Sequence, residues 1–424
     1  MVFQCVLLFV GFCAGLWVSR YCFLAIAAFT VLSSFGRDLK NVFYQLLFSL
    51  PFTMVYKLSP SGTSLFAYAM IVVGVVLIVR VNKFKGAQTL LIALFGGYAL
   101  VGVGGNYTLY IKMIVGLFLF YLFVEVMETS DFKNLIGAFT LGVLGSSFIG
   151  LFKTTSPQVG AYFRDMKTIY VNGEESHRFT GLYLDPNYYS IAVIFALTLC
   201  FMLYYYKRAN RGVLAALSVA LVLFGTLSYS KMFLLSLGLV GAIFGANGLK
   251  SPRTMIATLF GFAVGFAMVC KWALSSTYAT VMTKRFLDGD VSTGRFDIWS
   301  AYVRHFDASL KTLFFGDGLG AEYLSVDAPH NSYLEIVYFV GLLGGAIFFA
   351  TLFSIFRGGK RNINRGAIHY VLPVVFCFMC SVLGCFTIND LAFYCMLLWL
   401  AYNFGAQKEE ERDFPYWYAL EGRR

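Results

Sequence analysis

Several ionisable residues of this 424-residue chain stand beside long apolar stretches, where charged groups are costly unless they serve a function. His330 follows Pro329 and directly precedes an apolar run, and Glu335 lies five residues further on. Arg295 and Lys231 stand at the beginning of two other candidate helices. A neutral histidine can accept a proton from a hydroxyl group near pH 7, while arginine and lysine bind phosphate oxygens. Together these residues are typical of a site that handles a phosphate-bearing substrate.

A second polar group precedes another long apolar run. It contains Arg178, Asp185 and Asn187, and a further amide, Asn331, directly follows His330. Arginine presents a planar fork that matches phosphate oxygens, so Arg178 is a candidate ligand for a diphosphate. Structural roles stay open beside this one, with Arg178 as an ion-pair partner of Asp185 and the other cations as groups that only reach water.

Three more ionisable residues have structural interpretations of their own. Lys112 falls within an apolar stretch, where it functions as a cation, pairs with an acid or reaches the membrane interface. Asp390 ends the polar break Thr387-Ile388-Asn389-Asp390, which predicts a helix cap. His305 is expected to be a surface histidine.

Composition decides the class of protein that must hold these residues. Of the chain, 59% is apolar and 13% is charged, whereas soluble domains average about 45–50% apolar and about 25% charged residues. A soluble enzyme, a disordered chain and a disulfide scaffold are therefore excluded. The 45 Phe and 27 Tyr residues suit aromatic belts at the two membrane surfaces. A polytopic membrane protein remains.

Runs of roughly 20 apolar residues predict membrane helices. Fourteen candidate runs occur and several are short, so the predicted fold class is an all-α transmembrane bundle of 12–14 spans. The first run lacks a basic leader and a cleavage site, which favours a membrane anchor over a signal peptide. The predicted spans lie near residues 2–18, 21–35, 41–57, 64–82, 87–104, 108–127, 132–152, 188–206, 212–228, 231–248, 254–273, 332–356, 366–386 and 389–405.

The distribution of Lys and Arg predicts the orientation of the spans. If the N-terminus is cytoplasmic, the short cytoplasmic loops carry fifteen Lys and Arg residues and the short outer loops carry three. Cytoplasmic loops collect basic residues, so both termini are predicted to lie inside the cell. The same rule accounts for the net charge of +11, and we therefore expect no nucleic acid as a partner.

Two long segments interrupt the spans and fall on the outer side in this topology. The second contains apolar residues partly at helical spacing, which predicts an amphipathic helix from about Arg295 to Leu313 at the membrane surface. The predicted organisation is N-terminal membrane helices at 1–152, a first outer loop at 153–187, central membrane helices at 188–274, a large outer loop at 275–331, C-terminal membrane helices at 332–406 and a cytoplasmic tail at 407–424.

Metal sites and cofactors find little support in the residues. Asp288-Gly289-Asp290 is the one Asp-x-Asp match, and it lies in a turn-like stretch. Cys377 and Cys380 are three residues apart but have no second cysteine pair and no nearby histidine. We therefore expect no metal and no cofactor.

Four short motifs resemble the O-antigen ligase and polymerase superfamily of bacterial envelope glycosyltransferases. Two belong to the large outer loop and the apolar run after it. One is His330-Asn331 followed, after nine residues, by Gly341, and the other is Gly294-Arg295 with Trp299 four residues after the arginine.

The other two motifs lie earlier in the chain. The family's Arg-x-x-x-Leu motif is matched by Lys231 to Leu235, with lysine in place of arginine. Lysine retains the positive charge but lacks the planar guanidinium that binds two phosphate oxygens at once. The polymerase-like motif Arg-Phe-x-Gly-x-x-x-Asp-Pro-Asn runs from Arg178 to Asn187. The resemblance covers residues 150–405.

The resemblance implies an activity. Such enzymes take a glycan from undecaprenyl diphosphate at the outer face of the bacterial inner membrane, without a metal and with inversion. Ligases pass the glycan to the sugar core of lipid A and polymerases to another carrier-linked unit, and the stretch from Asp185 to Asn187 tilts this chain slightly toward polymerase. The implied partners are the carrier-linked donor, a glycan or glycolipid acceptor and membrane lipids.

The resemblance also implies roles for single residues. Arg295, Lys231 and Arg178 would bind the diphosphate, and His330 would act at the acceptor hydroxyl as a base or as a positioning group. Catalysis is thereby expected from His330 and Arg295. The further candidates for substrate binding are Asp185, Asn187, Asn331 and Glu335.

A transporter or flippase for lipid-linked glycans is the alternative, and a structural or assembly protein is a third hypothesis. A transporter predicts charged residues on both membrane halves and often paired repeats, whereas this sequence has no repeated halves and gathers its polar groups on one side. The enzyme hypothesis predicts that Arg295, Lys231 and His330 converge on one outward-facing cavity and that Arg178 approaches it.

Overall fold

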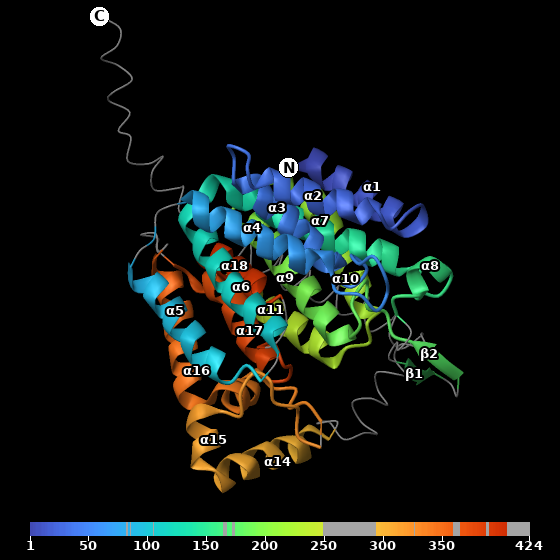
Figure 1. The fold of residues 1–424 in the computed structure, drawn as a ribbon. Coiled ribbons are helices and arrows are strands. Elements are labelled where there is room, and N and C mark those ends of the chain that lie inside the picture. The colour runs from blue at the N-terminus through green and yellow to red at the C-terminus, as the bar shows by residue number, and fades with distance from the viewer. Residues whose placement is uncertain are drawn as a thin grey trace, which may run out of the picture.

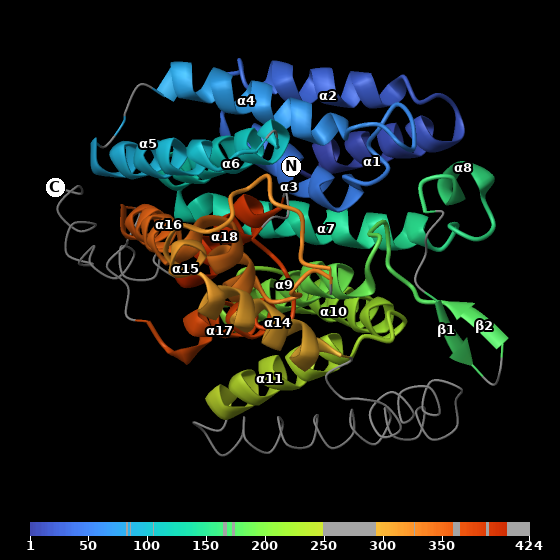
Figure 2. The same ribbon diagram turned by 60° about the horizontal axis from the view of Figure 1, so that its bottom comes forward.

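The computed structural model describes residues 1–81, 84, 86–104, 106–163, 168–171, 174–248, 294–325, 327–358, 365–386 and 390–404. These residues form a helical bundle with one short β-hairpin, drawn in Figures 1 and 2. The predicted all-α class is confirmed for the bundle, and the hairpin, which pairs β1 (Thr168–Val171) with β2 (Glu174–His177) in antiparallel register, is an addition within the first outer loop.

The helices of the bundle follow the predicted apolar segments. Each predicted span contains a helix, except for the one at 254–273, which lies outside the described residues, as do the tail at 407–424 and the Asp288-Gly289-Asp290 turn. The helices are α1 (Val2–Trp17), α2 (Cys22–Ser33), α3 (Lys40–Ser49), α4 (Leu65–Val81), α5 (Gly86–Val101), α6 (Tyr107–Val126), α7 (Phe132–Gly150), α9 (Pro186–Tyr205), α10 (Arg211–Thr226), α11 (Lys231–Gly248), α16 (Ser332–Gly358), α17 (Val371–Cys380) and α18 (Leu391–Tyr402). Short helical turns complete the connections: η1 (Leu50–Phe52), η2 (Thr129–Asp131), α8 (Pro157–Gly160) and η3 (Ala367–Tyr370).

Helix length and composition indicate a multi-pass membrane protein. Within the described residues, four helical segments are long and apolar enough to cross a membrane: Tyr107–Val126, Thr129–Gly150, Pro186–Tyr205 and Ser332–Gly358. Other apolar helices of 10–17 residues accompany them. The number of spans beyond these four stays a prediction.

The centre of the bundle is α9, most of whose side chains are buried. It packs against α7, α10 and α11, while α6 packs against α4, α5 and α18. Figure 2 shows these helices in successive layers, from α2 and α4 at the top through α6 and α7 to α9 and α11. We call the end at which α9, α11 and α16 begin the site end of the bundle.

The predicted amphipathic helix of the large outer loop is present but divided in two. Helix α14 (Arg295–Ala308) stops at Ser309, whose extended backbone separates it from α15 (Leu310–Phe315). The Ser309 hydroxyl accepts a hydrogen bond from the Thr312 N–H and so caps the second helix. The two helices lie below the bundle in Figure 1 and in front of it in Figure 2, so they lie against the site end.

Helix α15 packs against a break within α16. Gly341 interrupts the helix with φ 66° and ψ 179°, a conformation nearly exclusive to glycine. At this break the Asp317 and Gly318 N–H groups donate to the Tyr338 and Phe339 carbonyls. A Cβ atom on Gly316 would lie 2.6 Å from the Phe339 backbone, so the two segments touch main chain to main chain. The Gly341 of the predicted motif therefore fixes where the outer helices attach.

Candidate active site

The turn that precedes Lys231 is held by the polar residues of the first outer loop. The buried guanidinium of Arg178 donates from Nε to the Ser228 carbonyl at 3.0 Å and from Nη2 to the Tyr229 carbonyl at 3.2 Å. The Asn187 side-chain oxygen accepts from the Ser230 hydroxyl at 2.8 Å. Arg178 and Asn187 thus position this turn and the first residue of α11.

Asp185 links this region to α14. Its carboxylate caps α9 by accepting from the Asn187 N–H at 2.7 Å, and it also attracts Arg295 electrostatically. Burial lowers the pKa of Arg295 while Asp185 opposes that shift. Because arginine stays protonated in proteins, the group is a half-buried permanent cation. Arg295 therefore interacts electrostatically with Asp185 of the first-loop polar group.

His330 is held beside the same helix. Trp299, one turn after Arg295, donates from its indole N–H to the Pro329 carbonyl at 2.8 Å, directly before His330. Tyr302 donates to the Asp327 carbonyl at 3.0 Å from the next turn. The His330 backbone has φ 46°, and strained backbones of this kind gather at functional sites. Helix α14 thus presents Arg295 and fixes the segment that carries His330.

Glu335 and its neighbours attach α16 to the turn between α17 and α18. The buried Glu335 carboxylate accepts from the Tyr323 hydroxyl at 2.9 Å and from the Phe386 N–H at 3.0 Å. The Asn331 amide donates to the Ser381 carbonyl at 3.0 Å, and its oxygen accepts from the first N–H groups of α16. These contacts attach the start of α16, directly after His330, to the residues that follow α17.

Lys153 is a buried lysine of the first outer loop. Its side-chain nitrogen donates to the Thr180 hydroxyl and, at 2.9 Å, to the Tyr183 carbonyl, and it lies 3.6 Å from the centre of the Phe163 ring. Burial lowers its pKa to about 6. Lys153 therefore pins the loop that contains Arg178 and Asp185 to the end of α7.

Two residues expected to be structural take more specific places. His305 is not merely a surface residue, because its Nε2 lies 2.6 Å from the Asp317 carboxylate, and this pair ties α14 to the segment after α15. Asp390 occupies the capping position of α18 but makes no capping hydrogen bond with its side chain. It interacts electrostatically with Lys112 instead, and pairing with an acid was one of the roles open for that lysine.

The structure brings the predicted residues together as two linked groups. One contains Arg178, Asn187 and the turn before Lys231, and the other contains Arg295 and the His330 segment. Asp185 connects the two through its attraction for Arg295. Convergence of these side chains on one outward-facing cavity stays a prediction, since the cavities described below have other linings.

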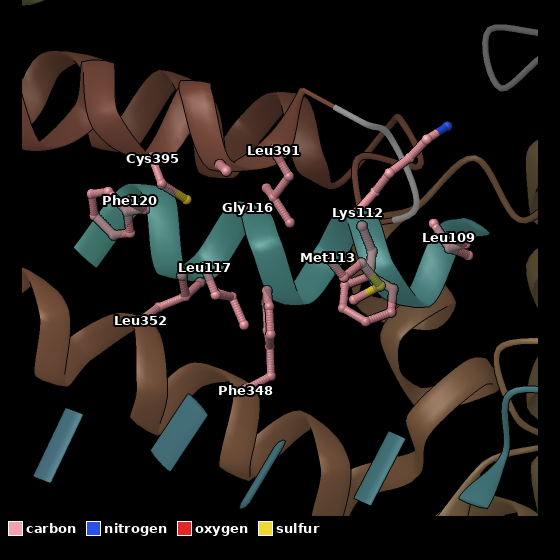
Figure 3. A pocket seen from close by; sticks show the side chains of 12 residues that line it. Leu109, Lys112, Met113, Gly116, Leu117, Phe120, Phe348, Leu352, Leu391 and Cys395 are labelled. Atoms are coloured by element: carbon pink, nitrogen blue, oxygen red, sulfur yellow. The ribbon is translucent and has the colours of Figure 1, made fainter. Parts of the chain in front are cut away.

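One cavity runs along α6, and its lining includes Lys112, Phe348 and Cys395, as Figure 3 shows. Another lies beside the outer helices, where Tyr98, Lys311 and Asp317 contribute to its wall.

Sequence reasoning missed the residues that support the site. Trp299 entered only as part of a motif, although its position four residues after Arg295 puts both side chains on one helix face. Lys153 and Tyr323 gave no signal, because their partners are distant along the chain or lie in loops. The glycines from Gly316 to Gly320 did give one, since a dense glycine run marks close backbone contact.

The described residues include no candidate metal centre. They contain no group of three or more His, Cys, Asp or Glu side chains arranged to hold a metal ion. Cys377 and Cys380 both lie in or at the end of α17 as free thiols.

Comparison with known proteins adds nothing to these observations. No protein-family model matches the chain, and neither a curated protein nor a solved structure matches it.

Proposed function

We propose that this protein is a membrane glycosyltransferase that moves a glycan from an undecaprenyl-diphosphate carrier to a hydroxyl group of an acceptor glycan or glycolipid. The observation that carries the proposal is that α14 holds the segment before His330 through hydrogen bonds. Trp299 binds the Pro329 carbonyl, and Arg295 lies one turn away on the same helix. A permanent cation and a titratable imidazole are thereby supported by one rigid element at the site end of the bundle.

The chemistry follows from these groups. The acceptor oxygen attacks the anomeric carbon of the donor sugar, and the bond between that carbon and the diphosphate oxygen breaks with its electron pair on the diphosphate. His330 accepts the proton of the acceptor hydroxyl or positions that hydroxyl. Arg295 and Lys231 stabilise the negative charge that develops on the leaving diphosphate. A single displacement of this kind inverts the anomeric centre.

The contacts refine the roles of the remaining candidates. Arg178, Asp185 and Asn187 hold the first outer loop against the turn before Lys231, so they act in this scheme mainly as positioning residues. Asn331 and Glu335 do the same for the His330 segment. We propose no metal and no cofactor for the reaction.

The proposed location is the bacterial inner membrane, with both termini in the cytoplasm and the site end facing outward. The excess of Lys and Arg in the short loops of the opposite end supports this orientation. A polymerase is favoured slightly over a ligase, on the residues from Asp185 to Asn187.

The test uses the purified full-length protein in nanodiscs with undecaprenyl-diphosphate-linked glycan, with and without EDTA. Wild-type protein should release carrier diphosphate and form a new glycosidic bond in both conditions. His330→Ala should lower the rate by about 10²–10⁴-fold, and Arg295→Ala should lower it strongly as well. The matched control is Arg304→Ala, which removes an exposed arginine from the same helix.

The outcomes separate the hypotheses. Elongation of the carrier-linked glycan identifies a polymerase, and transfer to a different acceptor identifies a ligase. Movement of the carrier across the bilayer without a new glycosidic bond would replace the enzyme proposal with the transporter. Equal activity of His330→Ala and Arg304→Ala would remove His330 from the chemistry.

A further inference from the structure

A pocket of about 240 Å³ lies between α5, α15 and α16, which are found at the lower left of Figure 1. Its walls are the last turn of α5 with Gly102, the end of α15 with Gly316 to Gly318, and the part of α16 just before the break at Gly341. A cavity of about 150 Å³ holds a benzene molecule, and pockets for drug-sized ligands enclose about 300–1,000 Å³. This pocket therefore has room for one compact chemical group.

The backbone around the pocket is held in place by contacts between the three helices. The Tyr98 hydroxyl donates to the Val340 carbonyl at 2.9 Å and also lies 3.3 Å from the Phe315 carbonyl. The main chains of Gly102 and Gly318 touch, because a Cβ atom on either glycine would overlap the other. All of these residues line the pocket. It is therefore bounded by fixed main chain and is already formed before a ligand binds.

One cation and one carboxylate belong to the lining, Lys311 of α15 and Asp317 after it. The Asp317 carboxylate lies 2.6 Å from His305 Nε2 and accepts from the Thr312 hydroxyl at 2.9 Å. A carboxylate offers about four acceptor positions, so these contacts leave it able to accept from a ligand. In the described part of the chain, Lys311 forms neither an ion pair nor a hydrogen bond. The two charges are complementary to a zwitterionic group, with its anion at Lys311 and an N–H cation at Asp317.

The rim of the pocket is apolar and exposed. Val101 and Phe315 both line the pocket, with 91% and 55% of their surface exposed, and Leu310 beside Lys311 is exposed as well. A lysine among exposed apolar residues is typical of a helix at a membrane surface, where the ammonium group reaches the polar head groups. A pocket with this rim, at the end of an apolar helix, opens toward lipid. Its ligand is therefore expected to be part of a lipid.

We propose that this pocket binds the head group of a bilayer phospholipid that carries a primary amine, such as phosphatidylethanolamine. Lys311 contacts the phosphate, Asp317 accepts a hydrogen bond from the ammonium group, and the acyl chains pass over Val101 and Phe315 into the membrane. The bound lipid joins α5 and α16 to α15, so it stabilises the attachment of the outer helices. The inference goes beyond the proposed function, because it concerns a second ligand at a separate place.

The first test measures which phospholipid the purified full-length protein retains in detergent. Phosphatidylethanolamine, phosphatidylcholine and phosphatidylglycerol with identical acyl chains are added to delipidated protein, and bound lipid is counted by native mass spectrometry. Phosphatidylethanolamine should be retained in preference to the other two, because the trimethylammonium group of phosphatidylcholine has no N–H and phosphatidylglycerol has no cation for Asp317. It should also raise the melting temperature most, since a ligand that binds only the folded state stabilises that state.

Two pairs of variants locate the bound lipid. Val101→Trp places a large ring at the rim, whereas Leu100→Trp places the same ring at an exposed neighbouring position outside the lining. Val101→Trp should abolish the preference for phosphatidylethanolamine, and Leu100→Trp should keep it. Lys311→Gln should lower the retention of this lipid by about threefold to fivefold, which is the effect of losing one partly exposed charge pair. The matched control Arg304→Gln removes an exposed cation of α14 outside the lining and should leave retention unchanged.

Several results would overturn the proposal. Equal retention of the three phospholipids would indicate only the ordinary lipid that surrounds a membrane protein. Retention by Val101→Trp that equals that of wild type, or an equal loss in Leu100→Trp, would place the lipid outside the pocket. Displacement of phosphatidylethanolamine by undecaprenyl phosphate at equal concentration would assign the pocket to a carrier lipid instead. None of these measurements uses glycan transfer, so failure of the pocket and failure of the proposed function are distinguishable.

Discussion

Replacement of Gly341 by alanine should detach the outer helices from the bundle. Gly341 lies at the break in α16, with φ 66° and ψ 179°. A Cβ atom there would overlap the backbone of Phe314 and Phe315 in α15. The variant can avoid the overlap only by straightening α16 or by moving α15 away, and either change disturbs the hydrogen bonds from Asp317 and Gly318 to α16.

The expected destabilisation has two parts. A residue other than glycine in this region of φ and ψ costs about 1–3 kcal/mol. Relief of the overlap costs about 1–3 kcal/mol more, as is common when atoms are added to a closely packed contact. The free energy of unfolding should therefore fall by about 2–6 kcal/mol.

The effect should reach the candidate active site. Helix α15 continues from α14 through the capped turn at Ser309, and α14 holds both Arg295 and the Pro329 carbonyl. A shift of α15 is thus expected to lower glycan transfer even at temperatures where the protein stays folded. The assays are apparent melting temperature in detergent and transfer rate in nanodiscs.

The matched control is Gly97→Ala in α5, where an added Cβ atom meets no atom within 4 Å. Alanine favours helix over glycine, so this variant should melt at or slightly above the wild-type temperature and keep its activity. If Gly341→Ala melts and transfers like Gly97→Ala, the break in α16 does not position the outer helices and the reasoning is refuted.

Three further variants test the supports of the site. Between pH 6 and 10 the unfolded chain binds a proton at Lys153, whose ordinary pKa is 10.5, whereas the folded chain, in which this pKa is about 6, does not. The stability of the wild-type protein should therefore rise with pH by up to about 1.4 kcal/mol per pH unit. Lys153→Met should flatten this rise in a series of melting curves, and an unchanged slope would contradict the prediction. Trp299→Phe keeps an aromatic ring but removes the hydrogen bond to the Pro329 carbonyl, so it should lower stability by about 1 kcal/mol and transfer by more than that loss explains; transfer equal to wild type would dissociate Trp299 from the site. Glu335→Gln leaves the Phe386 N–H and the Tyr323 hydroxyl with a neutral partner, so the free energy of unfolding should fall by about 1–3 kcal/mol, and a melting temperature at or above that of wild type would show that the carboxylate is not needed there.

The sequence by itself determined the class of protein and the order of its helices. Apolar content and the length of apolar runs are local properties, and a lipid environment requires each spanning segment to satisfy its own backbone hydrogen bonds as a helix. This is why the predicted segments in the described chain each contain a helix. The position of α14 was also predictable from a local property, because its apolar residues recur at helical spacing.

The breaks within the helices and the β-hairpin were harder to predict from the sequence. The break at Gly341 depends on contact between α15 and α16, which follow one another in the chain but touch through residues more than twenty positions apart. Gly341 itself stood in a motif, but the motif gave no reason for glycine. The reason is the left-handed backbone and the main-chain contact with α15.

The candidate site likewise has features that the sequence could suggest and features that only the tertiary structure decides. The types of Arg295, Lys231 and His330 were enough to suggest phosphate and proton chemistry, because charge and acidity belong to single side chains. Which residues contact phosphate and which position the loops is decided only by tertiary structure. Arg178 is bound by carbonyls fifty residues away, and the Pro329 carbonyl is held from α14 across thirty residues. Such contacts depend on how helices pack, and helix packing joins distant segments that no local pattern connects.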